Sequence, residues 1–219
     1  MKFNRMVMIS TAFLFLGVSV AQASPITTLY NTGVDASGVV LANGVIGDPH
    51  YSLISVPGGT STIMTRTSAG GYPIGPWLAD NALSVWIGPA NNSQLNGPVG
   101  DFIYRTSFDL TGFDPLSASI AGKWATDNPG TSLLLNGIVA VGMKTTGYTV
   151  WSPFILTSGF IAGINTLDFV VRNNGGPTGL RVEMTGDASA AIGAVPEPAT
   201  LALFGLGLMG VALGRRRKH

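Results

Sequence analysis

Apolar and polar residues alternate with a period of two through most of the central part of the chain. In residues 102–110, apolar side chains and one threonine occupy every second position, and Arg105, Ser107 and Asp109 lie between them. Because successive side chains of a β-strand point to opposite faces, this spacing predicts a strand buried on one face. Similar patterns predict strands at residues 118–124, 133–135, 138–141, 167–171 and 180–184, and weaker patterns predict strands at 39–46, 51–56, 62–66, 83–87, 148–151 and 154–156.

The segments between these strands are rich in residues that favour turns. Asn136-Gly137 separates two apolar runs, and both central residues of a tight type I′ turn need a positive φ angle, which Asn and Gly adopt readily. We therefore expect a β-hairpin at this point. About ten short strands with almost no helical periodicity predict an all-β fold, namely an antiparallel β-sandwich of the jelly-roll type.

The first residues of the chain have the features of a secretory signal peptide. A short basic region precedes an apolar stretch at residues 6–20, and the small residues Ala21 and Ala23 form a cleavage signal. We expect a signal peptide at residues 1–23 and a mature chain that begins at Ser24. A signal peptide is no part of the folded body, and it implies that the rest of the chain is exported.

The C-terminal residues combine three unlike elements in order. Val195-Pro196-Glu197-Pro198 comes first, an uncharged and mainly apolar run at 199–214 follows, and Arg215-Arg216-Arg217-Lys218 comes last. Proline fixes φ and lacks an amide donor, so the two prolines separate the run from the residues before it. As a helix the run would be roughly 24 Å long, somewhat shorter than a ~30 Å hydrocarbon core, and the cations after it would stay on the cytoplasmic side.

This arrangement resembles the PEP-CTERM sorting signal over residues 195–219. The resemblance implies an exported protein of a Gram-negative bacterium that makes extracellular polysaccharide. It also implies a membrane protease, exosortase, that recognises and removes the tail, so that the hydrophobic helix is a transient membrane handle. The alternative is an ordinary C-terminal anchor that the mature protein retains.

The composition changes once both ends are set aside. Residues 24–195 contain six basic and ten acidic residues, a formal net charge of −4, so this part lacks the basic surface of a nucleic-acid-binding protein. The sequence has no cysteine, which excludes disulfides, thiolate metal sites and cysteine nucleophiles. His50 is the one histidine between the two ends, and we expect a loop residue there rather than a catalytic base.

Five segments of the body carry a second resemblance. They are Tyr104–Leu110, Trp124–Asn128, Leu135–Gly137, Asn165–Val171 and Gly179–Val182. Together they resemble the galactose-binding-like β-sandwich over residues 49–185. The resemblance implies a module that often accompanies glycosidases and that often holds a structural calcium ion, for which Asp127, Asn128 and Asp187 are conceivable ligands.

Sugar binding is the chemistry that the loop residues favour. Carbohydrate rings stack on aromatic faces, while Asp and Asn side chains bind their hydroxyl groups. The candidate ligand-binding residues are Trp77, Asp80, Asn81, Trp86, Asp127, Asn128, Asn173 and Asn174. If their loops gather at one end of the sandwich, they make a shallow site in which Trp77 is the exposed ring. Trp86 and Trp124 fall at core positions of the pattern, so buried tryptophans are the alternative.

The sequence therefore predicts a body at residues 24–185, a linker at 186–194 and a sorting segment at 195–219. The predicted function is that of an exported, C-terminally sorted envelope or extracellular-matrix protein, with no catalytic residues and no cofactor apart from the conceivable calcium ion. Its expected partners are an exosortase-type protease, the membrane before processing, and an extracellular polysaccharide, but no nucleic acid. Two alternatives stay open: a secreted polysaccharide hydrolase that uses a pair of the scattered Asp and Glu residues, and a purely structural matrix protein.

Overall fold

The computed structural model describes residues 22–70, 77–90, 95–141, 147–191 and residue 207. Apart from residues 22–23 and 207, the expected signal peptide and sorting segment lie outside these ranges. Within the described ranges, no helix has both the length and the apolar character needed to cross a membrane. Two short 3-10 turns, η1 (Ser68–Gly70) and η2 (Pro115–Ser117), interrupt the strands.

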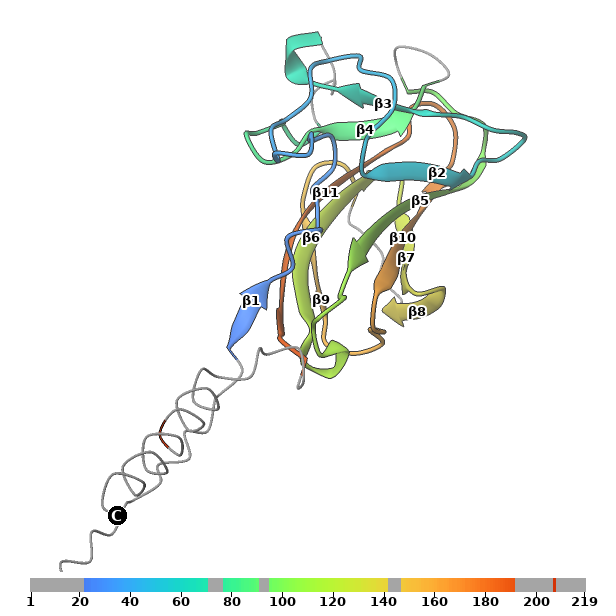
Figure 1. Cartoon of the computed structure of the whole chain (residues 1–219). Helices are drawn as coiled ribbons and strands as arrows, with labels where there is room; N and C mark the ends of the chain where they lie inside the picture. Colours follow the sequence, from blue (N-terminus) through green and yellow to red (C-terminus); the bar gives the residue numbers. More distant parts are fainter. Residues whose placement is uncertain (1–21, 71–76, 91–94, 142–146, 192–206, 208–219) are drawn as a thin grey trace, which may run out of the picture.

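Two antiparallel sheets pack face to face, which confirms the prediction of an all-β fold with little helix (Figure 1). One sheet has six strands in the order β3-β4-β11-β6-β9, with β1 paired to one end of β11. The other has five strands in the order β2-β5-β10-β7-β8. The strands of the first sheet are β1 (Ala23–Pro25), β3 (Ile63–Arg66), β4 (Trp86–Pro89), β6 (Ser119–Asp127), β9 (Ser152–Leu156) and β11 (Gly179–Ser189). Those of the second are β2 (Tyr51–Ser55), β5 (Gly100–Asp109), β7 (Gly130–Leu135), β8 (Ile138–Val141) and β10 (Ile164–Asn173).

The main core fills the space between the two sheets. Phe169 on β10 lies at its centre, with the ring of Trp124 at 5.6 Å and that of Phe154 at 6.1 Å between centroids. Gly122 on β6 makes room for Phe154, since a Cβ atom there would lie only 2.4 Å from the Phe154 ring. Full burial of each of these large side chains contributes on the order of 2–3 kcal/mol, so the core accounts for the packing of the sheets without disulfides.

The strongest sequence patterns correspond to strands. In β5, Phe102, Tyr104 and Phe108 are buried, whereas Arg105 and Ser107 face outward, as the alternation predicts. The hairpin between β7 and β8 is also confirmed. Its turn contains Asn136-Gly137 at φ angles of 53° and 79°, the left-handed region that these residues favour.

Several weaker predictions are wrong. Residues 39–46 form only isolated bridges, residues 148–151 form no strand, and β4 begins at Trp86 rather than at residue 83. The linker expected at 186–194 does not begin at residue 186, because β11 continues to Ser189. Pairing with β6 and with β1 extends the strand through residues whose small side chains resemble a linker in the sequence.

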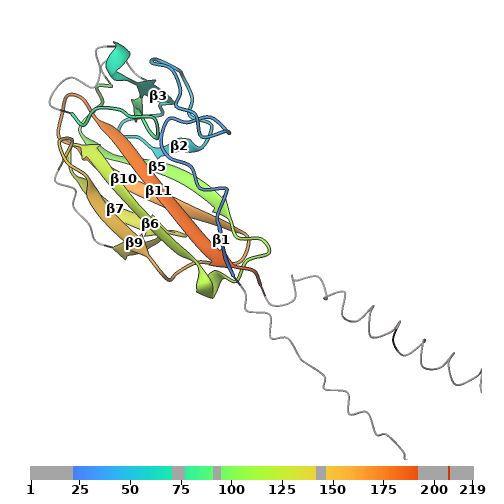
Figure 2. The same ribbon diagram turned by 90° about the vertical axis from the view of Figure 1, so that its left-hand side faces the viewer.

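The two ends of the body lie side by side at one end of the sandwich. Ala23 of β1 pairs with Ser189 near the end of β11, whereas Leu180, near the start of β11, pairs with Ile87 of β4. Figures 1 and 2 show β1 at one end of the molecule and β3 with η1 at the other. Loops that join strands at the second end therefore lie far from the points at which the chain enters and leaves the body.

Candidate functional site

The predicted ligand-binding residues come from three parts of the chain that meet at the end of the sandwich opposite β1. Asp127 pairs with Gly179 across β6 and β11, which places the β6–β7 turn beside the β10–β11 loop. There the side-chain oxygen of Asn128 accepts a 2.7 Å hydrogen bond from the backbone N–H of Asn174. The indole N–H of Trp77 donates to Asp127, so the segment at 77–86 joins the same region. The structure therefore brings all three loops together.

The tryptophan rings in this region do not form an exposed platform. Trp77 is 8% exposed and Trp86 is fully buried, and their ring centroids lie 4.4 Å apart, so the expectation of an exposed Trp77 ring is wrong. Both rings pack with Leu95 and Ala125 in a small second core, which we call the outer cluster. Trp86 lies on the outer face of the six-stranded sheet, where its Nε1 donates to the carbonyl of Leu78 at 2.8 Å. The segment that follows Trp77 therefore folds over the sheet and covers a face that would otherwise meet solvent.

Asn173 is also unavailable as an exposed ligand. Its side chain is fully buried, and its Nδ2 donates to the carbonyls of Gly97 and Pro98 at 2.8 and 3.1 Å. Its Oδ1 accepts the backbone N–H of Gly175 at 3.0 Å, which shapes the β10–β11 loop. Asn174, the next residue, is exposed. Of this predicted pair, only Asn174 therefore presents its side chain to solvent.

A buried arginine lies beside the outer cluster, and the sequence analysis did not predict it. The side chain of Arg181 on β11 is 1% exposed, and its guanidinium lies 4.9 Å from the centre of the Trp151 ring. Its Nε donates to Ser84 Oγ at 2.8 Å, and its Nη1 donates to the carbonyls of Leu78 and Ala79. Burial lowers the pKa of Arg181, while Glu183 and Asp80 act in the opposite direction. Arg181 thus ties the covering segment to the sheet.

Glu183 is the acidic centre of the same network. Its Oε1 accepts hydrogen bonds from Asn81 Nδ2 at 2.8 Å and from Ser84 Oγ at 2.9 Å, and Arg181 Nη2 lies at 3.5 Å. Its Oε2 pairs with Lys123 Nζ at 2.9 Å. Burial acts to raise the pKa of Glu183, but the hydrogen bonds from Lys123, Asn81 and Ser84 outweigh it, and the pKa is lowered. The Asn81 amide, predicted as a sugar ligand, is therefore engaged within the protein.

A sequence signal for this network exists, but it is ambiguous. Arg181 and Glu183 alternate with the apolar residues of β11 and therefore share the outer face of the sheet. Lys123 lies directly opposite Glu183 on the neighbouring strand β6. Charged residues in these positions usually indicate a solvated face, and only the covering segment makes this face an interior.

Asp127 has the most perturbed carboxyl group at this end of the molecule. It is 5% exposed, and Asn128 Nδ2 donates to its Oδ1 at 2.8 Å. Burial raises the pKa of Asp127 to about 6, although the hydrogen bond from Trp77 acts in the opposite direction. A carboxyl group with this pKa exchanges its proton near neutral pH, which is the property of a general acid or of a pH-sensitive contact.

The three conceivable calcium ligands do not converge. Asp127, the last residue of β6, pairs with Gly179 at the start of β11, whereas Asp187 pairs with Ser119 at the other end of the same two strands. In the part of the chain that the structure describes, no three His, Cys, Asp or Glu residues are grouped closely enough to hold a metal ion. A calcium site built from Asp127, Asn128 and Asp187 together is therefore incompatible with the strand register.

The outer face of the five-stranded sheet carries a shallow hollow of about 490 Å³. Arg105 forms its charged wall and makes a two-pronged ion pair with Asp168, at 2.6 and 2.7 Å. His50 lies in the loop before β2 and also lines the hollow, with its ring stacked on Tyr30 at 3.5 Å. The carboxylate of Asp48 accepts three backbone N–H groups and so shapes this loop. The histidine is thus a loop residue, as predicted.

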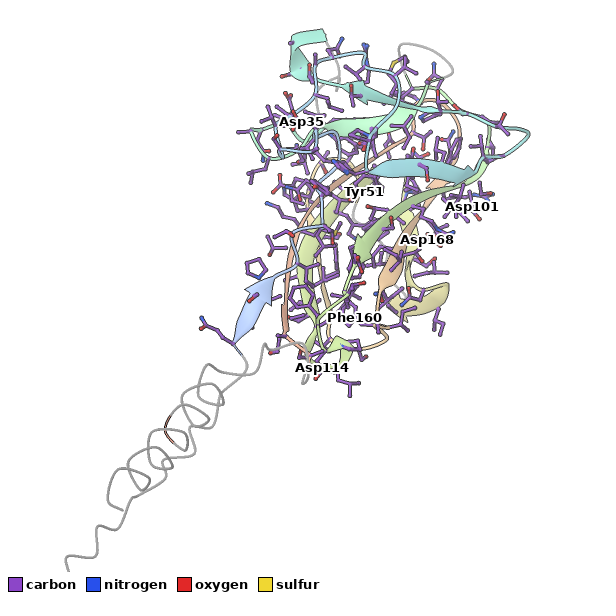
Figure 3. The ribbon with its side chains drawn as sticks, in the orientation of Figure 1. Asp35, Tyr51, Asp101, Asp114, Phe160 and Asp168 are labelled. Atoms are coloured by element: carbon purple, nitrogen blue, oxygen red, sulfur yellow. The ribbon has the colours of Figure 1, made fainter. Side chains whose placement is uncertain are left out.

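The other carboxylates are dispersed over the body. Figure 3 shows Asp35 and Asp114 toward opposite ends of the body, whereas Asp101 and Asp168 lie on the neighbouring strands β5 and β10. Asp35 and Asp114 accept backbone N–H groups in turns, and Asp114 caps η2. Asp101 pairs with Arg172 on the surface at 3.3 Å. These four carboxylates therefore have evident structural roles.

One segment of the chain matches a known family model. Residues 194–218 match the PEP-CTERM protein-sorting motif, which agrees with the resemblance of residues 195–219 noted in the sequence. No curated protein matches the chain. The motif indicates an exported protein that exosortase sorts to the cell envelope or the extracellular space.

Proposed function

We propose that this chain is an exported protein whose C-terminal segment is removed by an exosortase-type protease, and whose β-sandwich acts without catalysis in the cell envelope or the extracellular matrix. The observation that carries this proposal is the sorting motif at residues 194–218. Before processing, the tail tethers the protein to the membrane through its apolar run. The retained membrane anchor is the alternative outcome.

The arrangement of the body supports this proposal. The segments that carry the export signal and the sorting signal join the sandwich at the same end, because β1 pairs with the end of β11. A body tethered through either segment presents the opposite end, with its gathered loops, away from the membrane. Removal of the tail would leave the paired strands intact, since the matched motif begins after Ser189, the last residue of β11.

Substitution of both motif prolines, Pro196→Ala with Pro198→Ala, is expected to block processing. The protein should then accumulate in the membrane fraction with its C-terminus intact, whereas the wild-type protein should appear outside the cell without residues 215–219. Intact-mass spectrometry of both fractions makes this measurement. Pro115→Ala, in η2 of the body, is the matched control and should be processed normally. Extracellular wild-type protein that still ends in His219 would contradict the proposal.

For the body, we propose a galactose-binding-like sandwich of the jelly-roll type that associates with extracellular polysaccharide. Support comes from the two-sheet antiparallel architecture and from the gathering of amide-bearing loops at the end away from the tail. Asn128 and Asn174 lie side by side there, and Trp151 is half-buried against Lys123 and Arg181 on the outer face of the six-stranded sheet. The burial of Trp77 and Trp86 instead favours the purely structural alternative, so a direct binding experiment must decide.

Affinity electrophoresis in gels that contain polysaccharide from the producing cell tests this part of the proposal. We expect the wild-type body to be retarded, Asn174→Ala to be retarded less, and Asp187→Ala, at the opposite end of β11, to behave as wild type. If no polysaccharide changes the migration of the wild-type body, sugar binding is contradicted. The purely structural matrix role is then the alternative that is left. Release of reducing ends in the same samples would favour the hydrolase alternative, in which Asp127 is the carboxyl group with a suitably raised pKa.

A further inference from the structure

One buried carboxylate joins a lysine and an asparagine that come from different parts of the chain. Glu183 on β11 is 7% exposed, and its Oε2 lies 2.9 Å from Nζ of Lys123 on the neighbouring strand β6. Its Oε1 accepts a hydrogen bond of 2.8 Å from Nδ2 of Asn81, in the segment that covers the outer face of the sheet. The lysine amine and the asparagine amide therefore lie on the two oxygens of a single carboxylate.

The side-chain carbonyl of Asn81 is held by two backbone donors. Its Oδ1 accepts the N–H of Leu83 at 2.8 Å and that of Ser84 at 3.0 Å. Such contacts are ordinary in a turn. Here, however, they occur on an amide whose nitrogen donates to Glu183 at the same time. Two donors on a carbonyl oxygen also stabilise the negative charge that develops there when a nucleophile attacks the carbon, as in an oxyanion hole.

We propose that Lys123 and Asn81 become joined by an isopeptide bond, with Glu183 as the catalytic residue that carries the proton. Oε2 of Glu183 takes a proton from the Lys123 ammonium, and the neutral Nζ attacks Cγ of Asn81. The Cγ–Nδ2 bond then breaks, and Glu183 passes its proton to the departing nitrogen, which leaves as ammonia. Nζ loses a second proton, which the released ammonia carries away as ammonium. One amide replaces another, so the reaction needs neither an oxidant nor a reductant.

The charges around Glu183 determine how fast the bond forms. Burial acts to raise the pKa of Glu183, but the hydrogen bonds from Lys123, Asn81 and Ser84 outweigh it, and the pKa is lowered. The proton therefore rests on Lys123, where the nearby Trp151 ring, 4.7 Å from Nζ, also favours a cation. The free amine is scarce, so the reaction is slow and follows folding. The ion pair of Lys123 and Glu183 is thus the state of freshly folded protein.

The bond would give this chain a covalent link of a kind that its composition otherwise lacks. The sequence has no cysteine, so no disulfide holds the exported body together. An isopeptide bond between residues 81 and 123 would tie the covering segment to β6 and would restrict the unfolded chain, as a disulfide does. The inference depends neither on sugar binding by the loops nor on removal of the tail.

Intact-mass spectrometry of the purified exported protein tests the inference. Loss of one ammonia lowers the mass of a chain by about 17 Da, and we expect the fraction of such chains to rise over days at neutral pH. A succinimide at Asn136-Gly137 would lose the same mass, so a proteolytic digest must locate the change. The expected product is a branched peptide that contains both Asn81 and Lys123. A mass that stays unchanged over days would overturn the inference, and so would a digest that places the whole loss elsewhere.

Three variants separate the roles of the residues. Lys123→Arg is the matched control, because it keeps a cation beside Glu183 but has no primary amine, and it should keep its full mass. Asn81→Ser removes the amide at an exposed position and should also keep its full mass. Glu183→Gln keeps the size of the side chain and should slow the reaction by at least about 100-fold. A bond that forms in Glu183→Gln at the wild-type rate would contradict the proton-carrying role, and a mass loss retained by Lys123→Arg would contradict the bond.

Discussion

Arg181→Ala is expected to lower the free energy of unfolding by about 3–5 kcal/mol, the largest effect of any single charge removal considered for this body. The substitution leaves Glu183 buried beside Ser84 without its arginine, and it leaves the carbonyls of Leu78 and Ala79 without their donor. It also removes the cation that lies over Trp151. Urea unfolding of the exported protein at pH 7, followed by tryptophan fluorescence, measures this change.

Replacement of both members of the pair separates the charge effect from packing. The double variant Arg181→Leu with Glu183→Leu removes both buried charges, whereas Arg181→Ala leaves the Glu183 carboxylate with Lys123 as its cationic partner. The double variant should therefore be more stable than Arg181→Ala despite changing two residues. Arg172→Ala is the surface control, because its partner Asp101 and its own side chain are about half exposed, and it should cost less than about 1 kcal/mol. A double variant as unstable as the sum of its single changes would contradict the assignment of the loss to a buried carboxylate that has lost its arginine.

Alternation in the sequence was sufficient to predict the faces of the long strands. In β5 and β10 the buried side is the apolar side, since these strands lie at the centre of a sheet and one of their faces meets the opposite sheet. Asn136-Gly137 was equally informative, because the φ angles of a tight hairpin restrict which residues fit. Short strands near the ends of the chain, such as β1, have no such pattern and depend on partners far away in sequence.

The candidate site was predicted only in part. Turn residues indicated where loops lie, and three of these loops do meet at one end of the sandwich. The exposure of the side chains in this region could not be predicted from the sequence. Alternation of apolar and polar residues shows which side chains share a face of a strand, but it does not show whether another segment covers the outer face. The segment after Trp77 covers that face, which buries Trp86 and converts Arg181 and Glu183 from expected surface residues into an interior network.

The conceivable calcium ligands are separated in the structure for a related reason. Asp127 and Asp187 are both acidic residues of adjacent strands, but antiparallel register puts them at opposite ends of β6 and β11. Register follows from which residues pair across the sheet, and that pairing is not available from residue types alone. The raised pKa of Asp127 likewise results from burial of its carboxyl group, which the sequence does not reveal.

Asp127→Asn is expected to stabilise the body by about 2 kcal/mol at pH 8 and to have little effect below about pH 4. The pKa of Asp127 is about 6 in the folded protein and 3.8 in the reference state of an unfolded chain. The folded state therefore binds the proton more tightly, so the cost of the buried charge is absent below pH 3.8, grows as the pH rises toward 6, and is complete above 6. A difference of one pKa unit between the folded and unfolded states corresponds to about 1.4 kcal/mol of stability. The expected stabilisation is smaller than the full pKa difference would give, because residual solvent access screens part of the charge. Unfolding by urea at several pH values measures the difference.

Asp187→Asn is the matched control for the same removal of charge at an exposed position of β11, and its stability should follow that of the wild-type protein at every pH. A stabilisation by Asp127→Asn that is the same at pH 4 and pH 8 would contradict the assignment, because a buried charge destabilises the body only where the carboxyl group is ionised.

Addition of about 1 mM CaCl2 tests the other explanation, in which the Asp127 carboxylate binds a calcium ion. If calcium raised the melting temperature at pH 8 and Asp127→Asn abolished that rise, Asp127 would be a cation ligand, since a bound cation favours the ionised carboxylate and removes the cost on which the expected stabilisation depends.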